Sequence, residues 1–279
     1  MIVSELISFG SSILKKRKIA SHLLDSELLL SNILNEKREK LLLSTDTKIS
    51  LKNIKTFNKL KKRREKNEPI AYILKKKEFW SKEFLVNKNT LIPRPETELL
   101  VEKIVDYFSN KNLFILDIGT GSGCIILALL DELKKAQGVG IDISKKAIEV
   151  AIKNSKKLKI KNKLKFYNRS FDQIFGVKFD LIVSNPPYIC SHEIKNLSED
   201  VRNYEPRLAL DGGNDGLDVI KKVIYKSKSI LKRKGMLALE IGFGQYKKVS
   251  QILKLKGFKN KFLIRDYQNN IRCILSILV

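Results

Sequence analysis

The residues best suited to carry out chemistry are Asn185, Pro186, Pro187 and Tyr188, which directly follow the apolar run Phe179–Ser184. Prolines fix the backbone φ at about −65° and lack an N–H donor. The Asn185 side-chain oxygen and the Pro186 carbonyl are therefore expected to point rigidly into a crevice as acceptors. They match the two hydrogens of a planar –NH2 group, and Tyr188 offers an aromatic face for a planar substrate. The pattern predicts chemistry on an amide or aromatic amine nitrogen; the alternative is a Pro-Pro turn that only ends a strand.

An amide nitrogen is a poor nucleophile because its lone pair is delocalised. Two acceptors would hold it in line with a reactive methyl group and stabilise the positive charge that develops during transfer. No general base is obligatory, since the N–H becomes acidic as the new bond forms. We therefore predict Asn185, Pro186 and Tyr188 as catalytic residues, and these three together with Pro187 as substrate-binding residues.

A glycine-rich turn supplies a second candidate site. Its glycines directly follow the apolar run Leu113–Ile118, and glycine lets a backbone turn sharply and approach a cofactor. Asp142 follows the next apolar run, where a carboxylate can accept hydrogen bonds from both ribose hydroxyls of an adenosine cofactor. The predicted cofactor-binding residues are Gly119, Thr120, Gly121, Ser122, Gly123, Asp142 and Asn185.

The residues alone leave two cofactors open. A nicotinamide dinucleotide uses the same geometry, with a third small residue near Cys124. Asp117, directly before the turn, favours a cofactor that carries an α-amino group, such as S-adenosylmethionine. A nicotinamide enzyme would also leave Asn-Pro-Pro-Tyr unexplained. The residues therefore favour a methyltransferase that acts on an amino or amide nitrogen.

The elements that would position both motifs alternate along the chain from Pro95 onward. The predicted strands are Leu113–Ile118, Val139–Ile141, Leu164–Tyr167, Phe179–Ser184, Met236–Ile241, Phe262–Arg265 and Ile271–Ile277. Helix-length segments separate the first five, which is typical of βαβ units in a parallel sheet. The last two are close enough to pair as an antiparallel hairpin. The predicted fold class is α/β, with a mostly parallel, Rossmann-like sheet of seven strands and a ligand crevice beyond the carboxyl ends of the strands.

The first 74 residues have helical periodicity instead. Ser21 and Ser50 stand where each could cap a helix. The run Lys61–Arg64 is interpreted as a solvated helix end rather than a phosphate-binding patch, and Glu78–Val86 predicts a β-hairpin. We expect three parts: a helical substrate-docking domain at 1–75, a β-hairpin linker at 76–94 and a methyltransferase domain at 95–279.

The chain has 279 residues and a net charge of +25. This charge either favours an acidic partner or nucleic acid or reflects a compositional bias, because the excess is mostly lysine. Three scattered cysteines and two histidines predict neither a disulfide framework nor a metal site. No apolar run reaches the roughly 18–20 residues of a membrane-spanning helix. The first residues do not resemble a signal peptide, so we expect a cytoplasmic protein.

Several longer segments resemble the HemK/PrmC family, the release factor glutamine methyltransferases. The resemblance covers nearly the whole chain, and its segments are Glu68–Ile73, Glu78–Trp80, Leu91–Glu98, Gly119–Gly123, Asn185–Tyr188 and Glu205–Gly213. Asn-Pro-Pro-Tyr is shared with adenine-N6 methyltransferases and with the ribosomal-protein glutamine methyltransferase. Ile92–Glu98 is much more specific to the release factor branch.

The resemblance implies a class I methyltransferase fold behind an N-terminal helical domain, with S-adenosylmethionine as cofactor and S-adenosylhomocysteine as product. It implies that the substrate is the glutamine of a Gly-Gly-Gln loop in class I release factors, and that Phe171 packs on the adenine. We expect a monomer that requires neither a membrane nor nucleic acid. Two positions depart from the family pattern: Ser170 replaces a common acid, for which Asp172 is a candidate substitute, and Lys75 replaces a usual glycine.

The nearest competing function is an adenine-N6 methyltransferase that acts on DNA or RNA, which the basic charge would suit. The N-terminal segment carries no clear helix-turn-helix or zinc signature, which argues against it. A non-enzymatic nucleic-acid-binding protein is a third possibility. Such a protein would have no reason to combine Asn185, Tyr188 and Asp142.

Overall fold

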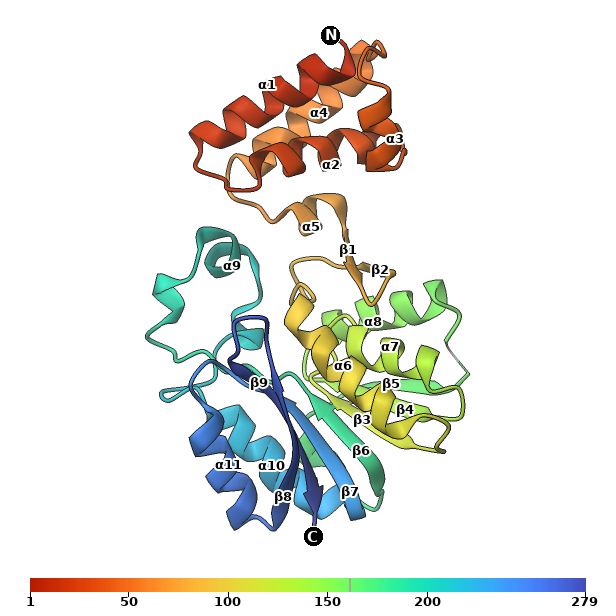
Figure 1. Cartoon of the computed structure of the whole chain (residues 1–279), viewed down its shortest axis with the longest axis vertical. Coiled ribbons are helices and arrows are strands. Elements are labelled where there is room, and N and C mark those ends of the chain that lie inside the picture. Colours follow the sequence, from red (N-terminus) through yellow and green to blue (C-terminus); the bar gives the residue numbers. More distant parts are fainter. Residues whose placement is uncertain (161) are drawn as a thin grey trace. The chain divides into compact units, whose positions relative to one another are not determined.

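A computed structural model describes residues 1–160 and 162–279 of the chain (Figure 1). The backbone packs into two compact units. Unit 1 comprises Met1–Lys75 and Ser198–Tyr204, and unit 2 comprises Lys76–Leu197 and Glu205–Val279. A short segment from far along the sequence thus packs with the N-terminal helices.

Unit 1 is a helical bundle, as the periodicity predicts. Its helices are α1 (Val3–Lys16), α2 (His22–Leu34), α3 (Arg38–Leu43), α4 (Leu51–Arg64), α5 (Ile70–Leu74) and α9 (Glu199–Tyr204). Helices α1, α2 and α4 contact one another, and their fully buried side chains include Leu6, Leu29, Leu30 and Phe57. Burial of such an apolar stripe is what stabilises an amphipathic helix.

The two predicted helix caps have different outcomes. Ser50 caps α4, because its hydroxyl oxygen accepts a hydrogen bond from the Asn53 N–H at 3.3 Å. Ser21 does precede α2, but it makes no capping hydrogen bond; its hydroxyl donates to Asp25 at 2.8 Å instead. The predicted capping role of Ser21 is therefore wrong.

The run Lys61–Arg64 at the end of α4 is a solvated helix end only at Lys62, which is exposed; for the other three residues our interpretation is wrong. Lys61 and Arg64 are buried. The Arg64 guanidinium donates to Asp25 on α2 at 2.6 Å, and Arg63 makes two hydrogen bonds to Glu68. A buried charge is tolerated only when it is paired, and removal of one partner is strongly destabilising. These cations therefore hold unit 1 together.

Unit 2 begins with the predicted β-hairpin, formed by β1 (Lys76–Phe79) and β2 (Lys82–Leu85). Trp80 and Ser81 at its turn have φ values of 52° and 54°, and positive φ at both positions gives a turn whose twist matches that of the strands. The Trp80 backbone N–H donates to Glu98 and its indole N–H donates to Glu132. These bonds attach the hairpin to α6 (Pro95–Phe108) and α7 (Cys124–Glu132).

The main sheet of unit 2 contains the seven predicted strands. They are β3 (Phe114–Ile118), β4 (Gln137–Asp142), β5 (Leu164–Asn168), β6 (Phe179–Ser184), β7 (Leu231–Glu240), β8 (Phe258–Arg265) and β9 (Ile271–Leu278). Their order is β5-β4-β3-β6-β7-β9-β8, and only the pairings of β9 are antiparallel. The predicted mostly parallel sheet with a C-terminal hairpin is confirmed. Strand β7 begins at Leu231 rather than at the predicted Met236. The apolar pattern missed its first half because Lys232–Lys234 are polar and exposed.

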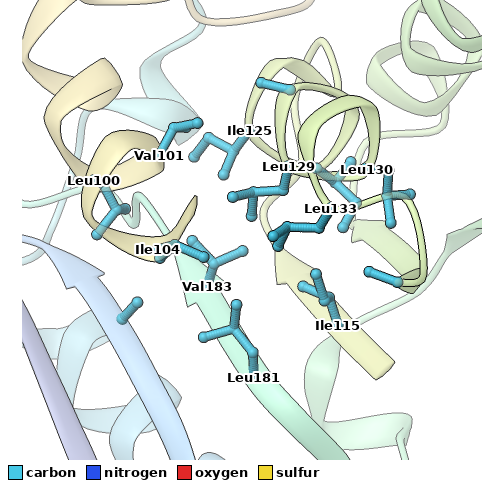
Figure 2. Packing of buried hydrophobic residues seen from close by; sticks show 14 of the residues in the cluster. Leu100, Val101, Ile104, Ile115, Ile125, Leu129, Leu130, Leu133, Leu181 and Val183 are labelled. Atoms are coloured by element: carbon cyan, nitrogen blue, oxygen red, sulfur yellow. The ribbon is translucent and has the colours of Figure 1, made fainter. Parts of the chain in front are cut away.

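Helices cover both faces of this sheet (Figure 1). On one face, α6 and α7 pack against β3 and β6; Figure 2 shows Ile104 and Leu129 directed toward Ile115, Leu181 and Val183. On the other face, α10 (Asp218–Ile230) contacts β7, and α11 (Tyr246–Leu255) contacts β8 and β9; their buried residues join a cluster with Leu116 and Ile182 of β3 and β6. Helix α8 (Lys145–Lys157) contacts β4 and β5. The sheet is therefore buried on both sides, as parallel sheets are.

The strand order brings the candidate motifs to one edge of the sheet. Strand β3 lies between β4 and β6, and it ends at Ile118, immediately before the glycine-rich turn. Strand β4 ends at Asp142, and β6 ends one residue before Asn185. Because neighbouring parallel strands run in the same direction, these three ends form a crevice at their carboxyl edge.

Candidate active site

The loops beyond β3, β4 and β6 line a cavity of about 330 Å³. This volume lies within the range of small-molecule sites, on the order of 300–1,000 Å³. Most of the predicted site residues line it: Gly119, Thr120, Gly121, Ser122, Asp142, Phe171, Asn185, Pro186 and Pro187. Among the residues that the structure describes, Gly123 and Tyr188 are the predicted positions that do not.

The glycine-rich turn has a left-handed backbone at each of its glycines. The φ values are 73° at Gly119, 57° at Gly121 and 81° at Gly123, a region that side chains with a Cβ atom rarely adopt. A Cβ added at Gly119 would meet no described protein atom within 4 Å, so this position presents bare backbone to the cavity. Gly123 instead begins α7 and packs closely on Ala151 of α8. Its role is to allow close packing of two helices.

Asp142 is held by the turn that it faces. Its Oδ2 atom accepts a hydrogen bond from the Gly121 N–H at 3.0 Å, and its Oδ1 atom accepts one from the Ser144 N–H at 2.8 Å. Burial raises the pKa of Asp142, and the backbone N–H donors oppose that rise. A carboxylate oxygen has two lone pairs. Each oxygen therefore keeps one acceptor site for a ligand hydroxyl.

Asp117 lies beneath the same turn and is completely buried. Thr120 donates a hydrogen bond to its Oδ2 atom at 2.7 Å, while Oδ1 has no partner among residues 1–160 and 162–279. Burial raises the pKa of this carboxyl to about 7, and the bond from Thr120 opposes the rise. Asp117 is therefore a titratable group next to the cavity, although it does not line the cavity itself.

The adenine side of the predicted site is formed by Phe171, which lines the cavity from the short 3-10 helix η1 (Phe171–Gln173). The hydroxyl of Ser170 accepts a hydrogen bond from the Asp172 N–H and donates one to the Asp172 carboxylate. Neither Ser170 nor Asp172 lines the cavity, whereas Arg169 does. Both candidates for the usual acidic contact are thus engaged with each other at the start of η1.

Asn185 is anchored through its amide nitrogen. Its Nδ2 atom donates to Thr97 Oγ1 at 3.2 Å, and Thr97 in turn donates to Glu240 Oε2 at 2.6 Å. No hydrogen bond within residues 1–160 and 162–279 uses the Asn185 Oδ1 atom or the Pro186 carbonyl. Both acceptors that the sequence analysis singled out are thus available at the wall of the cavity.

Tyr188 has surroundings that the sequence analysis did not anticipate. Its hydroxyl donates to Glu240 Oε1 at 3.3 Å and accepts a hydrogen bond from Arg272 at 3.2 Å. Burial, together with the negative charge of Glu240, raises the pKa of the phenol. The structure therefore places the phenol of Tyr188 on a buried carboxylate, and the lining of the cavity gives no support to a stacking role for its ring.

Two of the segments that carry the family resemblance meet at the rim of the cavity. Arg94 donates to Glu205 Oε1 at 2.6 Å, and Glu205 also accepts a hydrogen bond from the Ile92 N–H. Arg94 itself lines the cavity. Farther along, the backbone of Asp211 forms a parallel bridge with Ile189, just after Asn-Pro-Pro-Tyr. These contacts explain why both segments are needed to build one site.

Sequence reasoning missed the network of Thr97, Glu240 and Arg272. Thr97 lies in the segment that carries the most specific resemblance, but no role was assigned to it. Glu240 carried a signal of its own, because it is the one carboxyl group in the buried, otherwise apolar run Met236–Ile241. Such a residue is almost never fully buried unless it is paired.

No group of three or more His, Cys, Asp or Glu side chains in residues 1–160 and 162–279 could hold a metal ion. Within the same residues, no helix is both long and apolar enough to cross a membrane.

Known proteins resemble this chain in both units. The PrmC N-terminal domain family matches residues 5–74, and a methyltransferase domain family matches residues 109–240. The release factor glutamine methyltransferase of Buchnera aphidicola is 40% identical over 98% of this chain and 98% of its own length. The bifunctional methyltransferase of Rickettsia felis is 37% identical over 98% of this chain, but this chain spans only 57% of that protein.

A solved structure supports the fold. A methyltransferase from Pyrococcus furiosus superposes with a TM-score of 0.53 over 70% of this chain and 87% of its own, at 16% sequence identity. At that identity the likeness shows the fold alone. Together with the strand order, it confirms the predicted class I methyltransferase fold.

Proposed function

This chain belongs to the family of release factor glutamine methyltransferases, and from that membership we propose that it methylates a glutamine side chain of a peptide chain release factor. The methyl group comes from S-adenosylmethionine, and the acceptor is the amide nitrogen of the glutamine in a Gly-Gly-Gln loop. The observation that carries the proposal is the anchored amide of Asn185, which leaves the Asn185 oxygen and the Pro186 carbonyl as acceptors at the cavity wall.

These two acceptors would orient the glutamine nitrogen and stabilise the positive charge that develops on it. The amide nitrogen of glutamine is a weak nucleophile, and it must approach the methyl donor in line with the bond that breaks. Hydrogen bonds from its two N–H groups to Asn185 and Pro186 would fix that approach. As positive charge develops on the nitrogen, both hydrogen bonds strengthen, so they stabilise the transition state more than the ground state.

The residues around the cavity fit S-adenosylmethionine. Asp142 has one acceptor site left on each carboxylate oxygen, which suits the two adjacent hydroxyls of a ribose. The turn Gly119–Ser122 presents backbone to the cavity, and Phe171 offers an aromatic face for an adenine. When bound, the cofactor supplies an electrophilic methyl group on a sulfonium. The residues of this chain bind and orient it.

Unit 1 is the proposed docking element for the protein substrate, and it offers a suitable surface. One face of α4 and the turn after it carries five exposed lysines at helical spacing: Lys52, Lys55, Lys59, Lys62 and Lys66. No ion pair within residues 1–160 and 162–279 uses any of them. This lysine stripe suits an acidic protein surface. We further propose that the protein acts as a cytoplasmic monomer and requires no nucleic acid.

Labelled S-adenosylmethionine provides the test of this function. The protein is incubated separately with a class I release factor, with ribosomal proteins and with DNA, and incorporation of the label is measured in each. We expect label in the release factor alone, at the glutamine of its Gly-Gly-Gln loop. Label in DNA or in a ribosomal protein, with none in the release factor, would refute the proposal.

A further inference from the structure

One buried carboxylate is linked to both ends of the Asn-Pro-Pro-Tyr segment, directly to Tyr188 and through Thr97 to Asn185. Glu240, at the carboxyl end of β7, accepts a hydrogen bond from Thr97 on one oxygen and from Tyr188 on the other. Thr97 also contacts the Asn185 amide, and Arg272 donates to the Tyr188 hydroxyl. Glu240 and Thr97 are 0% and 2% exposed, so water does not compete for these bonds.

Burial raises the pKa of Glu240, while the hydrogen bond from Thr97, the positive charge of Arg272 and the hydrogen bond from Tyr188 oppose that rise. With this carboxyl group ionised, the number of protons in the network determines which way the Asn185 amide points. A threonine hydroxyl has a single proton, and the short 2.6 Å contact assigns the Thr97 proton to the Glu240 carboxylate. The Thr97 oxygen can then only accept from Asn185. The Asn185 atom that faces Thr97 must therefore be the NH2 nitrogen, and Oδ1 must face the other way. If Asn185 were flipped, its oxygen and the Thr97 oxygen would face each other as two acceptors with no proton between them, which is unfavourable.

The Tyr188 hydroxyl also has a single proton. Its hydroxyl proton goes to Glu240, and its oxygen accepts from Arg272. The two residues that bracket Pro186 and Pro187 are thus tied to the two oxygens of one side chain. Because the prolines between them have little backbone freedom, fixing both ends also fixes where the Pro186 carbonyl points.

We infer that Glu240, acting through Thr97 and Tyr188, is the positioning residue that orients both substrate acceptors of this active site. The inference rests on the proposed methyl transfer only for its kinetic readout. Thr97 lines the cavity and Glu240 does not; in the role that we infer, both keep Asn185 Oδ1 and the Pro186 carbonyl aimed at the substrate nitrogen. Residues that orient the ligands of metal sites typically change activity by roughly 10–100-fold when they are lost, and we expect an effect of the same size here.

Thr97→Val is the most direct test, because valine keeps the shape of threonine and lacks the hydroxyl. We expect kcat to fall by roughly 10–100-fold, while the dissociation constant of S-adenosylmethionine changes little. The thermal midpoint should also fall, because Glu240 Oε2 loses its donor, so kcat is measured well below that midpoint. Thr97→Ser restores the hydroxyl and should restore most of kcat. Ser227→Ala is the matched control, since it removes a fully buried hydroxyl that has no partner among residues 1–160 and 162–279. It should leave kcat unchanged.

A double-mutant cycle separates positioning from general damage to the site. If Thr97 acts through Asn185, Thr97→Val should cost almost nothing further in an Asn185→Ala background. Glu240→Gln should lower kcat in the same way, because Thr97 and Tyr188 donate to different oxygens of Glu240 and the glutamine NH2 group replaces one of them. If Glu240→Gln does not fold, the Thr97 variants still decide the matter. Additive losses in the cycle, or a Thr97→Val variant with kcat within about two-fold of the wild type, would overturn the inference.

An NMR measurement tests the inference without any turnover. The side-chain NH2 signals of Asn185 are assigned by their loss in Asn185→Ala. In the wild type, one of these protons should be shifted downfield and protected from solvent exchange by its bond to Thr97; in Thr97→Val this protection should disappear. If release factor is not methylated but the signals behave in this way, the proposed function fails and the positioning role stands. Unchanged Asn185 signals in Thr97→Val would refute the positioning role.

Discussion

At the scale of single residues, the site consists of acceptors whose direction is set by their neighbours. Asn185 keeps its oxygen available because its nitrogen is bound to Thr97. Asp142 keeps one acceptor site on each oxygen because single backbone N–H groups occupy the others. Residue type alone predicted these roles, since amides and carboxylates after strand ends are natural ligand groups. The direction of each side chain depends on tertiary contacts.

Asp142 should account for a large part of the affinity for the cofactor. Asp142→Ala removes two acceptors for ribose hydroxyls, and we expect S-adenosylmethionine to bind more weakly by about 1.5–3 kcal/mol, as is usual for lost charge-assisted hydrogen bonds. Isothermal titration calorimetry measures the change. Asp172→Ala, which removes a carboxyl that does not line the cavity, is the control and should bind normally. Equal affinities for the wild type and Asp142→Ala would contradict the assignment.

Asp117 should make stability fall as the pH rises. Its pKa in the folded state is about 7 because of burial, whereas the pKa of an aspartate in an unfolded chain is about 3.9. Between these values the folded state keeps a proton that the unfolded state releases. The stabilising contribution is therefore complete below about pH 4 and is lost as the pH rises toward 7.

Urea unfolding at several pH values checks this dependence. The free energy of unfolding of the wild type should contain a component that declines between about pH 4 and pH 7, and Asp117→Asn should lack it. The comparison uses slopes, so a uniform loss of stability in the variant does not affect it. Parallel profiles for the two proteins would show that Asp117 does not titrate in this range.

At the scale of elements, the sequence predicted the strands and turns well because their signals are local. The order of apolar runs and helix-length spacers predicts a parallel sheet, and the glycines after Leu113–Ile118 predict the turn at its edge. The positioning network escaped prediction, because Thr97 and Glu240 are 143 residues apart. Lys61–Arg64 was misjudged for the same reason, since the Arg64 partner Asp25 is 39 residues away on another helix.

Asn154 is the residue that joins the hairpin to the cofactor turn. It is completely buried on α8; its Oδ1 atom accepts from the Leu85 N–H, and its Nδ2 atom donates to the carbonyls of Leu85 and Ser122. Asn154→Ala leaves these backbone groups without partners. We expect a loss of about 2–4 kcal/mol in the free energy of unfolding.

Urea unfolding of the wild type, Asn154→Ala and Lys153→Ala checks this role of Asn154. Lys153→Ala changes the exposed neighbour on the same helix and should be nearly neutral. An effect of Asn154→Ala below about 0.5 kcal/mol, the size of an ordinary surface substitution, would mean that these hydrogen bonds do not hold the hairpin to the turn.

At the scale of the whole molecule, the chain combines a catalytic unit with a helical unit that carries no catalytic motif. Selection of one glutamine requires binding energy from contacts remote from the reacting amide. The lysine stripe is our candidate for those contacts, and the net charge of +25 would assist electrostatic steering of an acidic partner. The sequence alone could not separate these exposed lysines from the buried Lys61 and Arg64.

Reversing charge on the lysine stripe should weaken recognition of the intact release factor. For the triple variant Lys55→Glu, Lys59→Glu and Lys62→Glu we expect kcat/KM to fall by roughly 10-fold or more at low salt, mainly through KM, because screened electrostatic contacts are lost. Activity on a short peptide that contains Gly-Gly-Gln should not change. Steady-state kinetics at two salt concentrations measure both effects.

A matched triple variant keeps this test specific. Lys228→Glu, Lys254→Glu and Lys259→Glu change the net charge equally at exposed positions of unit 2. This control should keep the kcat/KM of the wild type on intact release factor. If both triple variants lose activity equally, net charge rather than the lysine stripe governs the encounter.

We propose above all that Asn185 presents its oxygen to the amide nitrogen of a release factor glutamine during methyl transfer. The most direct test of this proposal compares the wild type with Asn185→Ala in single-turnover methylation of intact release factor, with the modified residue located by mass spectrometry and cofactor affinity measured in parallel. We predict methylation at the glutamine of Gly-Gly-Gln, a rate that falls on the order of 100–1,000-fold in the variant, and nearly unchanged binding of S-adenosylmethionine. A variant that methylates that glutamine at close to the wild-type rate would contradict the account.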